Sequence, residues 1–282
     1  MVLITAQGKP PLFSFGVISD VQYADIPDGC SFLGVPRYYR HSVLVLERAV
    51  QKWNSLQNLS FAVNFGDIVD GFCPKDQSLN AVKMIPSHDC SAYNDFSPTP
   101  GYRLVVLDGC DISVIGWPQD HPKSVEAVRF LKEKNPNLDK NSPVGLNDLE
   151  KRFLMINGAI GREQLEWLDQ VLQNATDLKQ KVIICCHLPL DPGATTPGAL
   201  LWNYNEVMDV IRKYKCVTVC LGGHEHRGGY SVDSHGVHHR VVEAALECPP
   251  NSDAFGYVDV YDERISLVGT DRMKSTAMVF DS

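Results

Sequence analysis

The sequence has no long apolar stretch, no block of basic residues and no pair of cysteines at Cys-x-x-Cys spacing. Its longest dense apolar run, Val182–Cys186, is far shorter than the ~18 residues that a membrane-spanning helix needs. The N-terminus has neither the basic region nor the apolar length of a secretory signal. These absences predict a cytoplasmic protein without a membrane partner.

Positive charge is also in short supply, with 26 Lys and Arg against 34 Asp and Glu, for a net charge of −8. Because attraction to a nucleic-acid backbone needs clustered Lys and Arg, this balance argues against a nucleic-acid partner. The nine cysteines are an odd number, and Cys185, Cys186 and Cys220 stand in apolar runs. We therefore expect buried, unpaired thiols in a reducing compartment and no structural zinc site.

Two common hydrolase motifs are missing as well. No Gly-x-Ser-x-Gly elbow presents a serine nucleophile, and the glycine-rich stretch 222–229 lacks the Gly-Lys-Ser/Thr ending of a phosphate-binding loop. No cysteine stands in the polar, partly exposed setting that a nucleophilic thiol needs. A covalent mechanism through serine or cysteine is therefore disfavoured.

What the chain does have is an alternation of short β-rich apolar runs with amphipathic segments, which is typical of an α/β fold. Expected strands cover Leu12–Ser19, Phe61–Phe65, Arg103–Leu107, Lys181–Cys186 and Val217–Leu221, and expected helices cover Tyr39–Trp53, Pro122–Lys134, Arg162–Leu172 and Asn203–Tyr214. Period-two segments then predict antiparallel C-terminal strands at Gly228–Val232, Val237–Glu243, Gly256–Val260 and Arg264–Val268. Without a repeat or a low-complexity linker, a single domain over residues 1–282 is the simplest organisation.

Polar clusters directly follow four of the expected strands: Asp20 with Gln22, Asp67, His187, and His224 with His226. Because loops at the carboxyl ends of strands converge on one edge of an open α/β sheet, these side chains could form one site. Carboxylates, a carboxamide and imidazoles suit Mn, Fe, Zn or similar divalent ions. Six ligands are better explained by two ions sharing one carboxylate, and such pairs stabilise a displacement at phosphorus. The sequence therefore predicts hydrolysis of a phosphoester or phosphoanhydride.

Each of these residues also has a simpler interpretation. Asp20 and Asp67 could be loop residues or helix N-caps, and His187 could be a hydrogen-bonded histidine at the edge of the core. The two histidines of Gly-Gly-His-Glu-His are harder to explain in this way, since two flexible glycines precede them. Three further histidines are interpreted as solvated residues of a hairpin: His235, His238 and His239.

The order of the clusters resembles the calcineurin-like metallophosphoesterase superfamily, whose blocks read D-x-H, G-D, G-N-H, a strand-end His and G-H-x-H. Here the first, second and last blocks read DVQ, GD and GHEH. The Gln in the first block, together with FGVISDVQYAD, GDIVDG, NGAIGREQLEWL, the HLPL block and GGHEHRGGY, makes the chain similar to the manganese-dependent ADP-ribose/CDP-alcohol diphosphatase family. The similarity runs over nearly the whole length.

This resemblance implies an α/β fold with a four-layer α-β-β-α sandwich and a mixed sheet. It also implies a ligand set in which Asp20, Gln22 and His226 bind a first ion, His187 and His224 bind a second, and Asp67 bridges the two. The implied cofactors are two divalent ions, manganese first, with Mg, Fe or Zn as alternatives. The neutral carbonyl oxygen of Gln22 makes the first site harder and so more congenial to Mn²⁺.

The implied substrates are ADP-ribose, CDP-choline, CDP-glycerol and similar nucleoside diphosphate esters. The family cleaves their pyrophosphate to a nucleoside monophosphate and a phosphorylated alcohol or sugar. A phosphomonoesterase or a cyclic nucleotide phosphodiesterase of the same superfamily is an alternative. The expected partners are thus small nucleotide diphosphates, and a monomer is expected although the sequence leaves the oligomeric state open.

The chain departs from the family pattern at the third block, because no Gly-Asn-His follows Asp67. Ser87-His88 stands where Asn-His is expected, so His88 becomes the candidate catalytic histidine. Only nine residues separate Gly71 from Ala81, fewer than the ~10–12 residues of a crossover helix. We therefore predict a shortened segment near residues 72–90. The chain is then either an active diphosphatase or a catalytically impaired relative that keeps metal and nucleotide binding.

Overall fold

The computed structural model describes residues 9–31, 33–73 and 92–280. Its first sheet contains β1 (Phe13–Ile18), β4 (Leu59–Asn64), β13 (Gly256–Val260), β14 (Arg264–Gly269) and β15 (Thr276–Val279). The order across this sheet is β15-β14-β13-β1-β4. β1 and β4 are parallel, whereas β13, β14 and β15 are antiparallel to their neighbours, as expected for the C-terminal strands.

The second sheet contains β5 (Asn94–Thr99), β6 (Tyr102–Leu107), β9 (Lys181–Cys186), β10 (Val217–Gly222), β11 (Gly229–Val232) and β12 (His238–Val241). Its order is β11-β12-β10-β9-β6-β5. The four central strands are parallel, and the two outer strands are antiparallel to them. Both sheets are therefore mixed.

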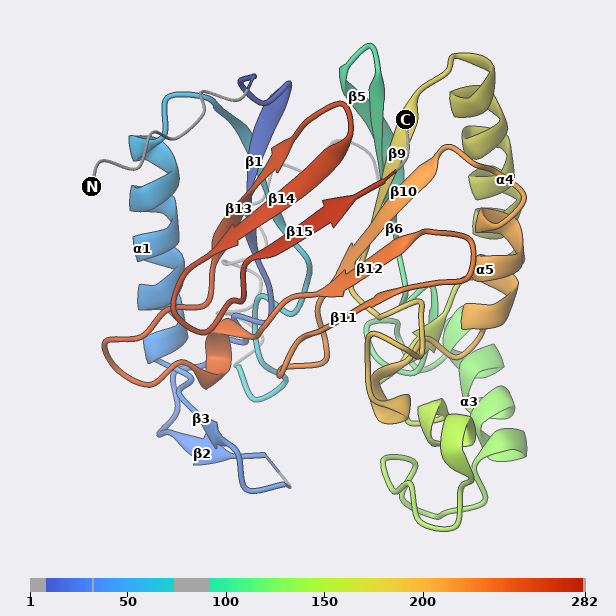
Figure 1. The fold of residues 1–282 in the computed structure, drawn as a ribbon. Helices are drawn as coiled ribbons and strands as arrows, with labels where there is room; N and C mark the ends of the chain where they lie inside the picture. The colour runs from blue at the N-terminus through green and yellow to red at the C-terminus, as the bar shows by residue number, and fades with distance from the viewer. Residues whose placement is uncertain (1–8, 32, 74–91, 281–282) are drawn as a thin grey trace.

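Helices cover the outer faces of the two sheets, with α1 (His41–Ser55) on the first and α4 (Arg162–Asp177) and α5 (Tyr204–Ile211) on the second (Figure 1). A further helix, α3 (Pro122–Lys134), lies beside the end of the second sheet. On α1, Val45, Ala49 and Trp53 recur at helical spacing and face the sheet. The four-layer α-β-β-α sandwich is confirmed.

The main core lies between the two sheets, where β-branched and aromatic side chains from both interdigitate. Phe15 on β1 is fully buried and stacks on Phe61 of β4, with ring centroids 5.2 Å apart. Leu104 and Ile183 contribute from the second sheet. Because this core clamps β1 and β4 against β6, β9 and β10, the loops that follow these strands are held in fixed relative positions.

Within residues 9–31, 33–73 and 92–280, the shorter elements are the hairpin β2 (Gly29–Cys30) with β3 (Pro36–Arg37), the pair β7 (Ile112–Ser113) with β8 (Gly158–Ala159), and three 3-10 turns at Asp148–Arg152, Pro197–Ala199 and Ala245–Glu247. Cys185, Cys186 and Cys220 are buried in the core, and none of them forms a disulfide. Among the residues placed by the structure, no helix is long and apolar enough to cross a membrane.

One interpretation of the sequence is wrong. His238 and His239 are 6% and 2% exposed, not solvated, while His235 is exposed as expected. The reason is that β12, which carries both residues, lies inside the second sheet between β10 and β11. His238 there uses both ring nitrogens, one with the hydroxyl of Tyr230 at 2.7 Å and one with the carbonyl of Val279 at 2.9 Å.

Candidate metal centre

Four of the predicted ligands converge where the two sheets end on the same side. Asp20 and Asp67 follow β1 and β4 of the first sheet, and His187 and His224 follow β9 and β10 of the second. One ligand atom from each of these four side chains lies within 4.8 Å of the others. Carboxylates from one sheet thus face imidazoles from the other.

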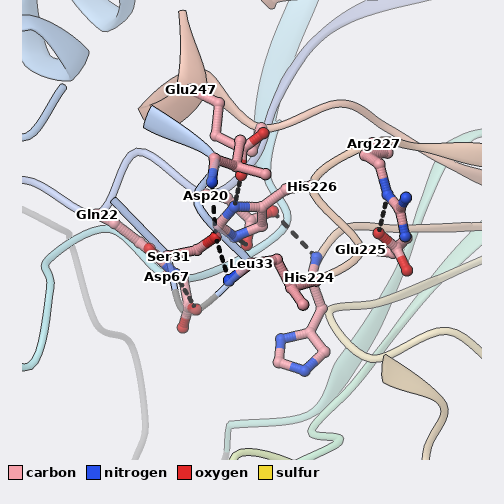
Figure 2. A network of polar contacts seen from close by, with 12 residues as sticks. Asp20, Gln22, Ser31, Leu33, Asp67, His224, Glu225, His226, Arg227 and Glu247 are labelled. Carbon is pink, nitrogen blue, oxygen red and sulfur yellow. Dashed lines mark hydrogen bonds and ion pairs between the residues drawn. The ribbon is translucent and has the colours of Figure 1, made fainter. Parts of the chain in front are cut away.

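The two remaining predicted ligands lie at the same place. Gln22 donates a 2.8 Å hydrogen bond from Nε2 to Oδ2 of Asp67, and Nε2 of His226 is 3.4 Å from Oδ1 of Asp20 (Figure 2). The structure therefore brings all six predicted metal ligands together. The candidate catalytic residue His88 lies outside the described residues, as does most of the segment predicted to be shortened.

The backbone at this site is strained. Asp20, Gln22, Asp67 and His224 have φ angles of 52°, 43°, 51° and 67°, in the left-handed region that disfavours residues with a side chain. Hydrogen bonds across the two loops hold this conformation, from Asp20 N to Gly66 O at 3.1 Å and from Gln22 N to Asp67 O at 2.8 Å. Strain of this kind persists only where the surroundings fix it, and it is concentrated at functional sites.

Two glycines allow the loops to approach one another. A Cβ atom at Gly66 would lie 2.7 Å from Nδ1 of His187, and Gly66 itself has a φ of 134°. A Cβ atom at Gly223 would lie 1.9 Å from Oγ of Ser19 and 2.7 Å from Oδ2 of Asp20. Since no side chain fits at either position, glycine is required for the carboxylates and imidazoles to meet.

The two carboxylates are kept ionised. Burial opposes the charge on Asp20, which is fully buried, but the His226 ring, 3.4 Å from its Oδ1, and the charge of His187 hold its pKa well below the usual range. The same balance applies to Asp67, where burial is outweighed by the nearby His187 and the pKa is lowered. Ionised carboxylates are the form that binds a cation.

The surroundings shift the pKa values of the three imidazoles in different directions. Burial would lower the pKa of His226, but its contacts with Asp20 and Glu247 raise it to about 10. Burial also opposes protonation of His187, whose pKa is nevertheless raised by Asp67 and Asp20. Burial, reinforced by the charge of His187, lowers the pKa of His224 to about 4. His224 is therefore a neutral imidazole at physiological pH.

Several buried polar atoms of the site have no hydrogen-bond partner among the described residues, namely Oδ1 of Asp20, Oε1 of Gln22 and both ring nitrogens of His187. Buried polar atoms are almost always hydrogen-bonded, so an unpartnered group of this size calls for an explanation. The donor set of carboxylate and amide oxygens with imidazole nitrogens is the one that Mn²⁺ and similar divalent ions take. The residues present thus fit a pair of divalent ions.

Two further buried polar residues contact the site and were not selected from the sequence. Oδ1 of Asn157 is 2.7 Å from Nε2 of His224, and Oε1 of Glu247 is 2.9 Å from Nδ1 of His226. Asn157 precedes β8, and Glu247 ends the 3-10 turn Ala245–Glu247. For Glu247 a partial signal existed, because two acidic residues, Glu243 and Glu247, stand within the otherwise apolar stretch 241–248.

A cavity of about 190 Å³ adjoins the site at His187. Its walls come from the ends of β4 and β6 and include Asn64, Phe65 and Asp108. Burial raises the pKa of Asp108 above the ordinary value for a carboxyl group. Among the described residues, a space bounded by strands of both sheets therefore adjoins one of the predicted ligands.

Comparisons with known proteins agree with this geometry. The chain is 58% identical to a manganese-dependent ADP-ribose/CDP-alcohol diphosphatase of Arabidopsis thaliana, covering 95% of this chain and 97% of the relative. It is 54% identical to the protein of the same name from Oryza sativa subsp. japonica, covering 99% and 98%. No protein-family model matches the chain.

A solved structure matches as well. The crystal structure of a dimetal phosphatase from Danio rerio superimposes with a TM-score of 0.89 at 33% identity, covering 96% of this chain and all of that one. The identity and coverage of these relatives are high enough to assign the chain to their family. The chain belongs to the manganese-dependent ADP-ribose/CDP-alcohol diphosphatase family.

Proposed function

We propose that the chain hydrolyses the pyrophosphate bond of ADP-ribose, CDP-choline, CDP-glycerol and similar nucleoside diphosphate esters, with two Mn²⁺ ions as cofactors. The observation that carries this proposal is the convergence of ligand atoms from Asp20, Asp67, His187 and His224 within 4.8 Å. The names of the relatives from Arabidopsis thaliana and Oryza sativa support the choice of metal and substrate.

The proposed ligand sets follow the grouping of the side chains. Asp20, Gln22 and His226 would hold the first ion, His187 and His224 would hold the second, and Asp67 would be shared between them. Asp67 suits the bridging position because it lies close to residues of both sets, with Oδ2 2.8 Å from Nε2 of Gln22 and 3.5 Å from Nε2 of His187.

When bound, two divalent ions stabilise the negative charge that develops on the attacking and leaving oxygens at phosphorus. The protein residues prepare the site for that chemistry. Gln22 orients the Asp67 carboxylate by donating a hydrogen bond to it, and Ser19 donates a hydrogen bond to Oδ2 of Asp20. The cavity next to His187 offers space for a phosphate group. His88 remains the candidate for protonating the leaving group.

The predicted shortening near residues 72–90 bears on how active the chain is. The alignment with the Arabidopsis thaliana relative spans 302 positions, more than the 282 residues of this chain, so the relative has residues without a counterpart here. This difference in length supports a shortened chain. If the lost residues include the Asn-His block, the second function, a catalytically impaired relative that keeps metal and nucleotide binding, becomes the outcome.

Purified protein incubated with Mn²⁺ and either ADP-ribose or CDP-choline tests the proposal, with AMP and CMP measured by chromatography. We expect AMP and CMP to exceed the amounts in a chelator-treated control. We expect p-nitrophenyl phosphate and cyclic AMP to be hydrolysed more slowly than ADP-ribose and CDP-choline. Loss of a positioned general acid lowers the rate about 10²–10⁴-fold, so we expect the rate of His88→Ala to be reduced by a factor in that range. His235→Ala, at an exposed hairpin position, serves as the matched control.

The outcomes are distinct. Folded protein that binds Mn²⁺ without turnover supports the impaired relative, whereas folded protein that binds no Mn²⁺ overturns both functions. If the protein preferred a phosphate monoester or a cyclic nucleotide as substrate, the alternative phosphomonoesterase or phosphodiesterase activity would be supported instead of the diphosphatase activity. A cytoplasmic location, a monomeric state and the absence of nucleic-acid and membrane partners also stay predictions, testable by fractionation and light scattering.

A further inference from the structure

Asn157 is fully buried and contacts one of the proposed ligands. It stands just before β8, and its Oδ1 atom is 2.7 Å from Nε2 of His224. Side-chain groups 2.7 Å apart must share a hydrogen bond, in which one group donates the proton and the other accepts it. Which atom donates depends on how the amide of Asn157 is oriented.

The backbone around Asn157 fixes that orientation. Its Nδ2 atom donates to the carbonyl oxygens of Arg152 and Gly198, each at 2.8 Å. If the amide were rotated by 180°, its oxygen would face these two carbonyl oxygens and two hydrogen bonds would become repulsive contacts. Amide orientations are assigned from such networks, and this network admits only one. The atom that faces His224 is therefore the amide oxygen, which can only accept.

The consequence falls on His224. Because Oδ1 of Asn157 only accepts, Nε2 of His224 must carry the proton that it donates. A neutral imidazole has one protonated and one unprotonated nitrogen, so Nδ1 of His224 keeps its lone pair. We propose that Asn157 is a positioning residue that holds His224 in the Nε2–H tautomer and thereby dedicates Nδ1 to the metal centre. This inference rests on the proposed ligand role of His224.

The neighbouring histidine is held by its other nitrogen. Nδ1 of His226 contacts Oε1 of Glu247 at 2.9 Å, which leaves Nε2 facing Asp20 at 3.4 Å. Two histidines that lie two residues apart thus present different ring nitrogens, and a different buried side chain accounts for each choice. Partners of this kind orient metal-binding imidazoles and raise metal affinity about 10–100-fold.

The first test reads the tautomer directly and needs no activity. Protein labelled with ¹⁵N in its histidine rings is freed of metal at pH 7.5, and long-range proton–nitrogen spectra are recorded. His224 is assigned from the signals that are lost in His224→Gln. We expect Nδ1 to show the chemical shift of an unprotonated nitrogen and Nε2 that of a protonated one. A protonated Nδ1, or averaged shifts at both nitrogens, would overturn the proposal.

The second test measures Mn²⁺ binding by calorimetry in Asn157→Leu, which keeps the size of the side chain but removes the acceptor. We expect affinity for one ion to fall about 10–100-fold and the ring shifts of His224 to average. Asn157→Asp keeps an acceptor for Nε2–H and is expected to preserve the tautomer, but its second oxygen faces the carbonyls of Arg152 and Gly198, so it is also expected to lose stability. Asn135→Leu is the control. Asn135 is equally buried, and it donates a 2.9 Å hydrogen bond to the carbonyl of Phe153 rather than to a proposed ligand.

These readouts separate the inference from the proposed function. If the wild type binds Mn²⁺ with His224 in the Nε2–H tautomer but turns over no substrate, the diphosphatase activity fails while the role of Asn157 stands. If Asn157→Leu binds Mn²⁺ as tightly as the wild type, or if Asn135→Leu loses as much affinity, the role of Asn157 is rejected. Should Asn157→Leu not fold, the tautomer seen in the wild-type spectrum still decides the matter.

Discussion

Gln22 and Asp67 are joined by a 2.8 Å hydrogen bond from Nε2 to Oδ2, which connects the loop after β1 with the loop after β4. Because Nε2 of Gln22 is committed to Asp67, its Oε1 atom is left without a protein partner among the described residues. An amide oxygen is a harder ligand than an imidazole nitrogen. One hydrogen bond thus orients the carboxylate proposed to bridge the ions and selects which atom of Gln22 an ion would meet.

Replacement of this amide by imidazole tests whether Gln22 sets the metal preference. In Gln22→His we expect the affinity for Mn²⁺ relative to Zn²⁺ to fall, since nitrogen ligands favour the softer ion. Competition calorimetry with both metals measures the ratio. Gln22→Leu, which removes the oxygen and the donor together, is expected to lower the affinity for both metals. An unchanged ratio in Gln22→His would show that Gln22 is not a ligand.

Gly223→Ala tests the close approach of the two sheets at the site. The added methyl group would meet Oγ of Ser19 at 1.9 Å, so Ser19 and the Asp20 carboxylate must shift. Forcing a methyl group into a packed site typically costs about 1–3 kcal/mol, and we expect that loss in the free energy of unfolding together with weaker Mn²⁺ binding. Gly101→Ala, where nothing lies within 4 Å, should change both by little. Wild-type stability and binding in Gly223→Ala would contradict the packing described.

Glu247→Gln tests whether the carboxylate behind His226 matters for the metal centre. Glu247 is 5% exposed, and its Oε2 atom lies 3.4 Å from a guanidinium nitrogen of Arg272. Removing its charge weakens the polarisation of His226, so Mn²⁺ affinity should fall by about tenfold or more. Glu243→Gln is the control, because Glu243 is equally buried but pairs with Arg240 at 2.7 Å. We expect that control to lose stability and to keep Mn²⁺ affinity; equal losses of affinity would count against Glu247.

The sequence predicts the parts of this molecule that depend on local pattern. Apolar runs such as Lys181–Cys186 and Gly256–Val260 match β9 and β13, because a buried strand needs a continuous or alternating set of apolar residues. The position of Asp20 and His187 directly after such runs then places them at one edge. Local signals therefore suffice for the α/β class and for the expectation that the six candidate ligands meet at one edge, whereas the four-layer arrangement is implied by the family resemblance.

Features that depend on distant contacts could not be predicted. β5 contains Asn94, Asp95 and Pro98, which are poor strand formers, and it exists because β6 pairs with it. Asn157 meets His224 across 67 positions of sequence, and nothing in its local pattern indicates that contact. The burial of His238 and His239 follows from the order of strands in the second sheet, which the sequence does not give.

The pH dependence of stability offers a test at a position away from the metal centre. His239 is 2% exposed, neither ring nitrogen has a hydrogen-bond partner within the described residues, and Nε2 is 3.8 Å from Oδ2 of Asp233. Burial lowers the pKa of His239, although Asp191 and Asp233 oppose this effect. The unfolded chain, with a histidine pKa near 6.5, therefore binds more protons than the folded chain at mildly acidic pH.

Since the unfolded state binds more protons in that range, stability must fall as the pH drops below about 6.5 and must be unaffected by His239 above it. His239→Gln removes the titrating ring, so the decrease in Tm between pH 7.5 and pH 5.5, measured with chelator present, should be smaller than in the wild type. His235→Gln, which alters an exposed histidine of the same hairpin, should keep the wild-type decrease. If both variants show the same decrease in Tm on acidification as the wild type, His239 is not held neutral in the folded protein. The burial of its ring then does not limit stability in acid.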